Sequence, residues 1–180
     1  MVLQMPPTDH ALANKVVVFL TTPPAASTGI PTLTEVNAAL FAQLHIYGTF
    51  NVPINQNTGE GPKKLGQRSV PTEFGLTNIP AITVNYSYKP QGLGTPGTAG
   101  NELYEALEPG VQVTTVVLDA IDGETDALVA ADIADIYLME AGVRSKGETG
   151  EGEFDQKQVM QQMIVVGGKA IAEDHALAAV

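Results

Sequence analysis

The pattern of apolar and polar positions predicts a chain of short strands. Residues 81–88 (AITVNYSY) alternate between apolar and polar side chains, which is typical of a strand with one buried face. Residues 15–20 (KVVVFL) are rich in β-branched side chains and predict another strand. Less regular apolar runs predict further strands at 46–52, 111–120, 133–143 and 158–166. The composition of 126–141 also suits a helix ending at Gly142, but a strand there gives 158–166 a partner that covers its edge.

Two short helices are expected between these strands. Thr32 and Glu35 fit a capping box, in which each side chain accepts a hydrogen bond from the other residue's backbone, and the apolar spacing that follows predicts a helix over 33–44. Asn101 is a candidate N-cap for a second helix over 101–107, which Pro109 and Gly110 would end. The tail, residues 170–180, also suits a short helix.

The largest irregular region is residues 53–80, which are rich in Asn, Gly and Pro. A structureless loop of that length is uncommon inside a compact domain, so we expect it to be either mobile or ordered by a neighbouring molecule. It carries three basic residues, Lys63, Lys64 and Arg68. Residues 1–14 are expected to form an N-terminal arm, and 92–100 a flexible linker.

These elements predict a mainly β (α+β) protein. About six strands and two short helices follow one another without a βαβ rhythm, which favours antiparallel pairing in a sandwich or barrel-like domain. A length of 180 residues suits one domain. We therefore expect a single domain over 1–180 with a long loop at 53–80, an acidic hairpin at 142–168 and a C-terminal arm at 170–180.

The hairpin at 142–168 (GVRSKGETGEGEFDQKQVMQQMIVVGG) is the most distinctive segment. Two runs that can form strands flank a long tip of glycine and charged residues, too long for a tight turn. It carries no catalytic group, which is compatible with a surface that contacts neighbouring molecules. The charged residues assigned to this tip are Arg144, Lys146, Glu148, Glu151, Glu153 and Asp155.

The formal net charge of -11 belongs to one half of the chain. Residues 1–90 hold four acids and five bases, whereas 91–180 hold sixteen acids and four bases. Such a chain does not predict a surface that grips nucleic acid, which needs clustered Lys and Arg. Its acidity does not argue against a surface that DNA passes without binding. No secretory signal and no apolar run of about 18 residues that would span a membrane are expected.

Candidate chemistry is weak throughout. The three histidines stand apart and there is no cysteine, so neither a zinc site nor thiolate chemistry is expected. Residues 92–97 match G-x-G-x-x-G, but Pro96 lies inside the motif and no βαβ unit follows, so a flexible connection is favoured over a nucleotide site. Asp119, Asp122, Glu124 and Asp126 surround a glycine turn without the EF-hand pattern. We expect no enzyme, no metal and no cofactor.

The order of elements resembles the major tail tube proteins of long-tailed bacteriophages, especially those that infect actinobacteria. The resemblance is carried by Gly142–Gly147, by the tip through Phe154, by the strand at 157–166 ending in Gly167 and Gly168, and by the helix at 101–107 after a tyrosine-bearing strand. It implies a β-sandwich or barrel-like domain with one packed helix. Six copies would form a ring and rings would stack into a tube, with loops and arms reaching between rings.

The resemblance also implies a place and partners. The protein would be made in the host bacterial cytoplasm and would belong to the virion tail, in contact with the tape measure, tail terminator and distal tail proteins and with no membrane. Double-stranded DNA would pass through the lumen without specific binding. Lys63, Lys64 and Arg68 are then candidates for contacts between rings. Candidates for the lumen wall are Asp132, Asp135, Glu140, Gln158 and Gln162.

Two other classes of function stay open at this point. A monomeric acidic β-sandwich that binds a ligand at a cell surface or after secretion would have a similar composition, but it predicts a monomer. A calcium- or nucleotide-binding enzyme predicts a shift in melting temperature with its ligand. A tail tube protein predicts self-assembly.

Overall fold

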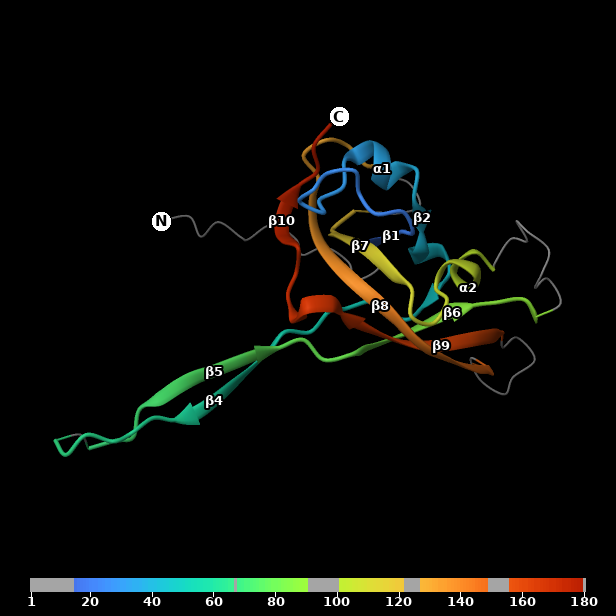
Figure 1. Cartoon of the computed structure of the whole chain (residues 1–180). Helices are drawn as coiled ribbons and strands as arrows, with labels where there is room; N and C mark the ends of the chain where they lie inside the picture. The colour runs from blue at the N-terminus through green and yellow to red at the C-terminus, as the bar shows by residue number, and fades with distance from the viewer. Residues whose placement is uncertain (1–14, 67, 91–100, 122–126, 149–155, 180) are drawn as a thin grey trace, which may run out of the picture.

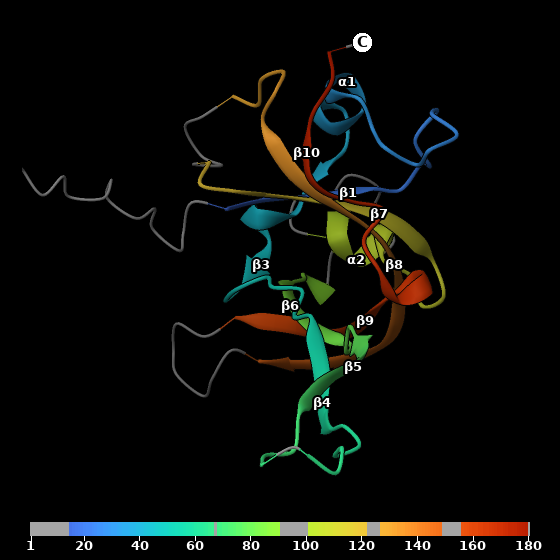
Figure 2. The same cartoon turned by 90° about the vertical axis from the view of Figure 1, so that its left-hand side faces the viewer.

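One curled antiparallel sheet organises the molecule (Figures 1 and 2). The computed structural model describes residues 15–66, 68–90, 101–121, 127–148 and 156–179. Its neighbouring strands follow the order β2-β1-β7-β8-β9-β6-β3, and β10 pairs with β8 beside this path. The strand bounds are β1 Lys15–Leu20, β2 Leu40–Phe41, β3 Ile46–Tyr47, β6 Ile82–Ser87, β7 Gln112–Asp119, β8 Ile133–Glu148, β9 Lys157–Val165 and β10 Ala172–Ala176. The prediction of a mainly β, antiparallel fold is confirmed.

Strand β8 joins the two halves of the sheet because it is 16 residues long. Its first part pairs with β7 on one side and with β10 on the other, and its second part pairs with β9 from Met139 to Glu148. The sheet bends between these parts, so that β1 and β7 face β9 and β6 across a core (Figure 2).

The main core fills the inside of this bend. Val17 and Phe19 of β1 meet Val84 and Tyr86 of β6 there, and Leu107 closes the cluster from the helical segment. A second core lies on the other side of β1, β7 and the start of β8, where α1 (Leu33–Asn37) and the C-terminal segment cover it. Because both faces of β1 are buried, its residues after Lys15 (VVVFL) are continuously apolar instead of alternating.

The helices are shorter than the sequence predicts. The capping box of Thr32 and Glu35 is confirmed, and the hydrogen bonds from the backbone N–H groups of Ala25 and Thr32 lower the pKa of Glu35. However, α1 ends at Asn37, and the predicted helix to residue 44 is wrong. Leu40 and Phe41 pair with β1 as β2, and Ala42–Leu44 form the 3-10 helix η1. Pairing with β1 thus replaces the last helical turns.

Three further corrections concern strands. Of the predicted strand 46–52, only Ile46–Tyr47 pairs, as β3 with β6. The tail is not helical: β10 pairs with β8, and Leu177 after it is buried in the second core. The described residues hold ten strands instead of about six. The alternating strand β6 and the β8–β9 pair are confirmed.

The second helix, α2 (Glu102–Ala106), is confirmed, but Asn101 does not cap it with its side chain. The Asn101 amide instead accepts a hydrogen bond from the backbone N–H of Lys89 at 2.6 Å and donates to the Lys89 carbonyl at 3.1 Å. This buried amide ties the end of the β6 segment to the start of α2.

The segment 53–80 is not structureless. Strands β4 (Asn55–Glu60) and β5 (Thr72–Asn78) pair with each other and with no other described strand, and they extend away from the rest of the molecule (Figure 1). Every residue of both strands is exposed. Local backbone pairing therefore orders the two strands, while Ile79 after β5 packs against the main core. The 3-10 helix η3 (Val166–Gly168) follows β9.

Candidate assembly surfaces

A β-bulge in β8 decides which side chains face outward from the β8–β9–β6 part of the sheet. Ala141 pairs with Met163 and Arg144 with Gln161, so Gly142 and Val143 together lie opposite Gln162. The bulge reverses the alternation along β8. Without it, Arg144, Lys146 and Glu148 would share a face with Glu140 and Gln162; with it, they lie on the inner side, and Val143 and Ser145 lie outside.

The outward side of this part of the sheet is uncovered in the described structure, and we call it the open face. Its rows of paired residues are mostly uncharged polar side chains with a few apolar ones, and Glu140 is the one member that is charged at neutral pH. Val143, Met160 and Ile164 are 83%, 37% and 49% exposed. The open face consists of Tyr47, Thr83, Asn85, Ser87, Glu140, Val143, Ser145, Gln158, Met160, Gln162 and Ile164.

Arg144 and Lys146, which the bulge turns to the inner side of the sheet, hold α2 in place. The guanidinium of Arg144 lies 4.0 Å from the centre of the Tyr104 ring, and its Nε and Nη2 donate to the carbonyls of Leu107 and Tyr104. The amine of Lys146 lies 5.5 Å from the ring centre of Tyr88, which stacks on Tyr104. These contacts satisfy carbonyls at the C-terminal end of a very short helix.

Gln161 connects three elements beneath the bulge. It is 1% exposed, its Oε1 accepts from the Tyr86 hydroxyl at 2.7 Å, and its Nε2 donates to the carbonyls of Leu107 and Gly142 at 2.9 and 2.7 Å. Burial raises the pKa of Tyr86 to about 12, so the hydroxyl keeps its proton and remains a donor. This satisfied amide fixes β6, α2 and the bulge relative to one another.

The carboxylates gather elsewhere, around the first part of β8 and β10. Burial, and then the charges of Asp135, Glu173, Asp119 and Asp174, raise the pKa of Tyr137 to about 12. Asp119 also pairs with Lys15 at 3.0 Å. The negative charge described here thus lies away from the open face.

The five residues predicted for the lumen wall do not lie together. Glu140, Gln158 and Gln162 share the open face, where Gln112 donates to the Glu140 carboxylate at 3.1 Å. Asp135 points to the other side and accepts from the backbone of Asp174 at 2.9 Å. Asp132 lies in the turn before β8 and accepts from the backbone of Val129 at 2.7 Å. The sequence analysis did not identify Val143 or Ser145, because their outward direction depends on the bulge. It also missed Met160, although this residue alternates with Gln158 and Gln162 along β9.

The charged residues assigned to the hairpin tip also do not form one group. Arg144, Lys146 and Glu148 belong to β8 and not to a tip, since the strand continues to Glu148. Glu148 forms an ion pair with Lys157 across the strand pair. Glu151, Glu153 and Asp155 lie outside the described residues, as do the G-x-G-x-x-G motif at 92–97 and Asp122, Glu124 and Asp126.

The basic residues Lys63, Lys64 and Arg68 lie near the outer end of the β4–β5 hairpin, and all three are exposed. The hairpin also exposes large apolar side chains. Phe74 is 78% and Leu76 83% exposed. A lone two-stranded hairpin is marginally stable in water, so these side chains indicate a surface that another molecule covers.

No feature of the described residues suggests a catalytic centre. They contain no group of three or more His, Asp or Glu side chains placed to hold a metal ion. Among the helices in this part of the chain, none is both long and apolar enough to cross a membrane. The fold and its exposed surfaces instead define a structural protein whose uncovered sheet face and projecting hairpin are suited to contacts with other subunits.

Comparison with known families gives this class a more specific identity. A family model described as phage tail tube protein matches residues 4–172, nearly the whole chain. The chain therefore belongs to the phage tail tube protein family, as the resemblance in its sequence suggested. A comparison with curated proteins finds no match. The protein is a structural component of the virion tail, and its partners are copies of itself and other tail proteins.

Proposed function

We propose that six copies join through their sheet edges into a ring, that rings stack into the tail tube, and that genome DNA passes along the lumen. The observation that carries this proposal is the direction of the two edge strands in one half of the sheet. Strands β8, β9, β6 and β3 are antiparallel in turn, so β3 at one end runs opposite to β8 at the other.

These edges suit each other in a head-to-tail contact. Beyond Ala141, the side of β8 away from β9 pairs with no strand of the described residues, and β3 pairs with β6 through only two residues. When β3 of one copy meets β8 of the next, the pair is antiparallel and the sheet continues across the boundary. A closed ring of such contacts removes the exposed edges that would otherwise promote aggregation.

The joined sheets then give the lumen an almost uncharged wall. With the open face inward, each copy contributes amide, hydroxyl and apolar side chains and the one carboxylate of Glu140. Without Lys or Arg, this face cannot replace the counterions of the phosphate backbone, so it does not hold DNA. Of the residues first proposed for the lumen, the proposal keeps Glu140, Gln158 and Gln162, because they share this face.

The β4–β5 hairpin acts as the arm between subunits. Lys63, Lys64 and Arg68 near its outer end are proposed to meet acidic side chains of the next ring. Such exposed ion pairs contribute about 0–1 kcal/mol each and weaken as salt screens them. We propose that they orient the arm, and that apolar contacts along its strands hold it.

Electron microscopy of the purified protein tests assembly, and cysteine labelling tests the direction of the open face. The chain has no cysteine, so Gln162→Cys and the loop variant Ser27→Cys each carry one thiol. In tubes, a maleimide on a large polyethylene glycol should label Ser27→Cys but not Gln162→Cys, whereas both should react in the monomer. Equal labelling of both variants in tubes would contradict an inward open face. A strictly monomeric protein at high concentration would contradict the whole proposal.

A further inference from the structure

The β4–β5 hairpin presents one aromatic side chain, Phe74, that its own chain leaves 78% exposed. Phe74 pairs with Thr58, while a bulge places Gly75 and Leu76 together opposite Asn57, so Phe74 and Leu76 point to opposite faces of the ribbon. The four steps along the strand from Asn78 to Phe74 hold the ring about 13 Å out from the root of the hairpin, at roughly 3.3 Å a residue. The pairing with β4 prevents Phe74 from folding back onto its own domain.

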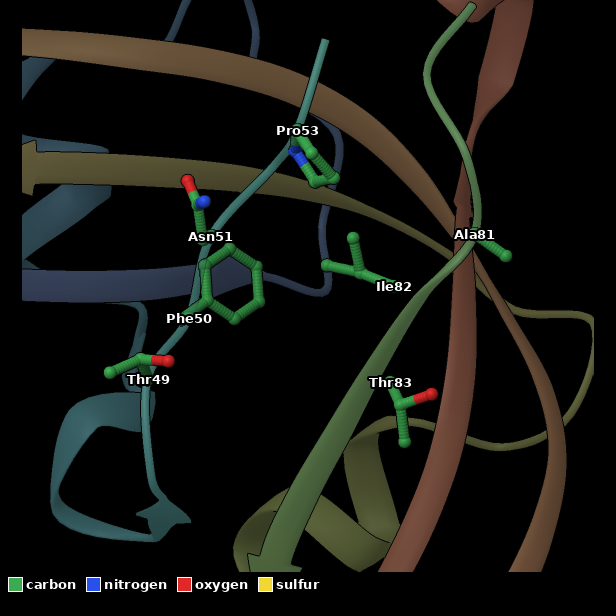
Figure 3. Close-up of a pocket in the computed structure, with 7 residues that line it drawn as sticks. All are labelled: Thr49, Phe50, Asn51, Pro53, Ala81, Ile82 and Thr83. Atoms are coloured by element: carbon green, nitrogen blue, oxygen red, sulfur yellow. The ribbon is translucent and has the colours of Figure 1, made fainter. Parts of the chain in front are cut away.

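A groove lies at the root of the same hairpin, between the segment that leads into β4 and the start of β6 (Figure 3). Its volume is about 250 Å³, smaller than the pockets that hold free ligands and suited to a single large side chain. Phe50, Pro53 and Ile82 supply apolar surface, and Thr49, Asn51 and Thr83 supply polar groups.

The groove is already formed in the isolated subunit. Phe50 packs edge-on against Phe19 of β1 with ring centres 6.1 Å apart, and its carbonyl accepts from the Lys15 amine at 3.0 Å. Ile82 belongs to the main core. A partner side chain therefore meets a fixed wall, and little ordering is needed when it binds.

We propose that Phe74 of one subunit inserts into this groove of a neighbouring subunit, and that this contact anchors the arm. A projecting apolar side chain and a separate groove on the same chain make a heterologous contact, which repeats from copy to copy and does not close on a pair. Aromatic anchors in preformed pockets dominate the energy of such interfaces. The inference rests on the proposed self-assembly and names the residues through which the arm acts.

Cross-linking tests the contact directly, because the chain has no cysteine. Ala81 lines the groove and is exposed, so a thiol there lies within reach of an inserted residue 74. Under mild oxidation of assembled protein, the double variant Phe74→Cys, Ala81→Cys should give a ladder of linked subunits. A mixture of the two single variants should stop at linked dimers of one copy of each. The control is the double variant Asn57→Cys, Ala81→Cys. Asn57 lies on the opposite face of the ribbon, so this variant should give no ladder.

Assembly measurements give an independent readout. Phe74→Ala should raise the concentration needed for assembly at least tenfold and leave the melting temperature of the subunit nearly unchanged, since the side chain is 78% exposed and belongs to no core cluster of the described residues. Asn57→Ala is the control on the other face. Ala81→Trp places a bulky ring at the rim of the groove and should act like Phe74→Ala, whereas Ala26→Trp, in an exposed loop, should not.

The outcomes separate this contact from the wider proposal. If the wild-type protein forms tubes, and Phe74→Ala forms them at the same concentration with no ladder from the double cysteine variant, the contact is refuted and the tube remains. If another occupant fills the groove, Ala81→Trp alone impairs assembly, and the role of Phe74 is refuted. If the wild-type protein forms no tubes at all, the proposed function fails and the contact with it.

Discussion

A side chain at Gly142 would meet the backbone of Gln162. An ideal Cβ at Gly142 lies 2.9 Å from the Gln162 carbonyl oxygen, closer than carbon and oxygen atoms approach without a shift of the backbone. This close approach is what permits the bulge, and the bulge in turn separates the charged side chains of β8 from its uncharged ones. One glycine thereby controls the chemistry of the open face.

Gly142→Ala should destabilise the subunit by about 1–3 kcal/mol, because the added methyl group overpacks the bulge against a strand that cannot yield. Gly147→Ala is the matched control in the same strand, since its Cβ would meet the Met160 methyl group at an ordinary 3.7 Å. Urea unfolding of both variants measures the difference. Equal stability of the two variants would show that the bulge tolerates a side chain.

Tyr86→Phe should cost about 1–3 kcal/mol, because it leaves the buried carbonyl oxygen of the Gln161 side chain without its donor. The double variant Tyr86→Phe, Gln161→Leu should lose less unfolding free energy than the sum of the two single losses. Each single variant already breaks the Tyr86–Gln161 hydrogen bond, so the second substitution does not break it again. A double-mutant cycle in urea measures this coupling. Strict additivity would contradict a linked network.

Arg144→Lys should loosen α2 and cost about 1–2 kcal/mol, since an amine cannot reproduce the two-pronged donation to the Leu107 and Tyr104 carbonyls or the stacking on the Tyr104 ring. Hydrogen exchange at residues 102–107 should rise more than exchange in β1. Lys146→Arg keeps its charge near Tyr88 and serves as the control. Unchanged exchange at α2 in Arg144→Lys would refute the anchoring role.

Stability should fall in strong base. The folded pKa of Tyr137 is about 12, above the ordinary value of 10, so folding favours the protonated phenol. That contribution is complete below pH 10 and is lost as the pH rises from 10 through 12. The urea midpoint should therefore drop between pH 10 and 12, and Tyr137→Phe should reduce the drop because it removes the titrating group. An equal drop in both proteins would show that a group other than Tyr137 causes it.

The sequence predicted the parts of this protein whose structure is set locally. The capping box at Thr32 and Glu35, the alternation of β6 and the pairing of 133–143 with 158–166 are all present. Helix 33–44 failed because its last residues, including Leu40 and Phe41, satisfy the same apolar pattern by pairing with β1. Apolar residues at short spacing do not reveal which distant strand will cover them.

The sequence also could not reveal which of the residues predicted for the lumen wall share one face, because that depends on strand pairing. The sequence by itself determined the β-rich class, the family resemblance and the surplus of acids in the second half of the chain, because composition and local pattern carry them. Only the tertiary structure decided where those acids lie. The register of β8 against β9 and its one-residue bulge at Gly142 turn Arg144 and Lys146 inward and Val143 and Ser145 outward. Because side chains alternate with a period of two, one extra residue reverses every position that follows it, and that residue is visible only against the partner strand.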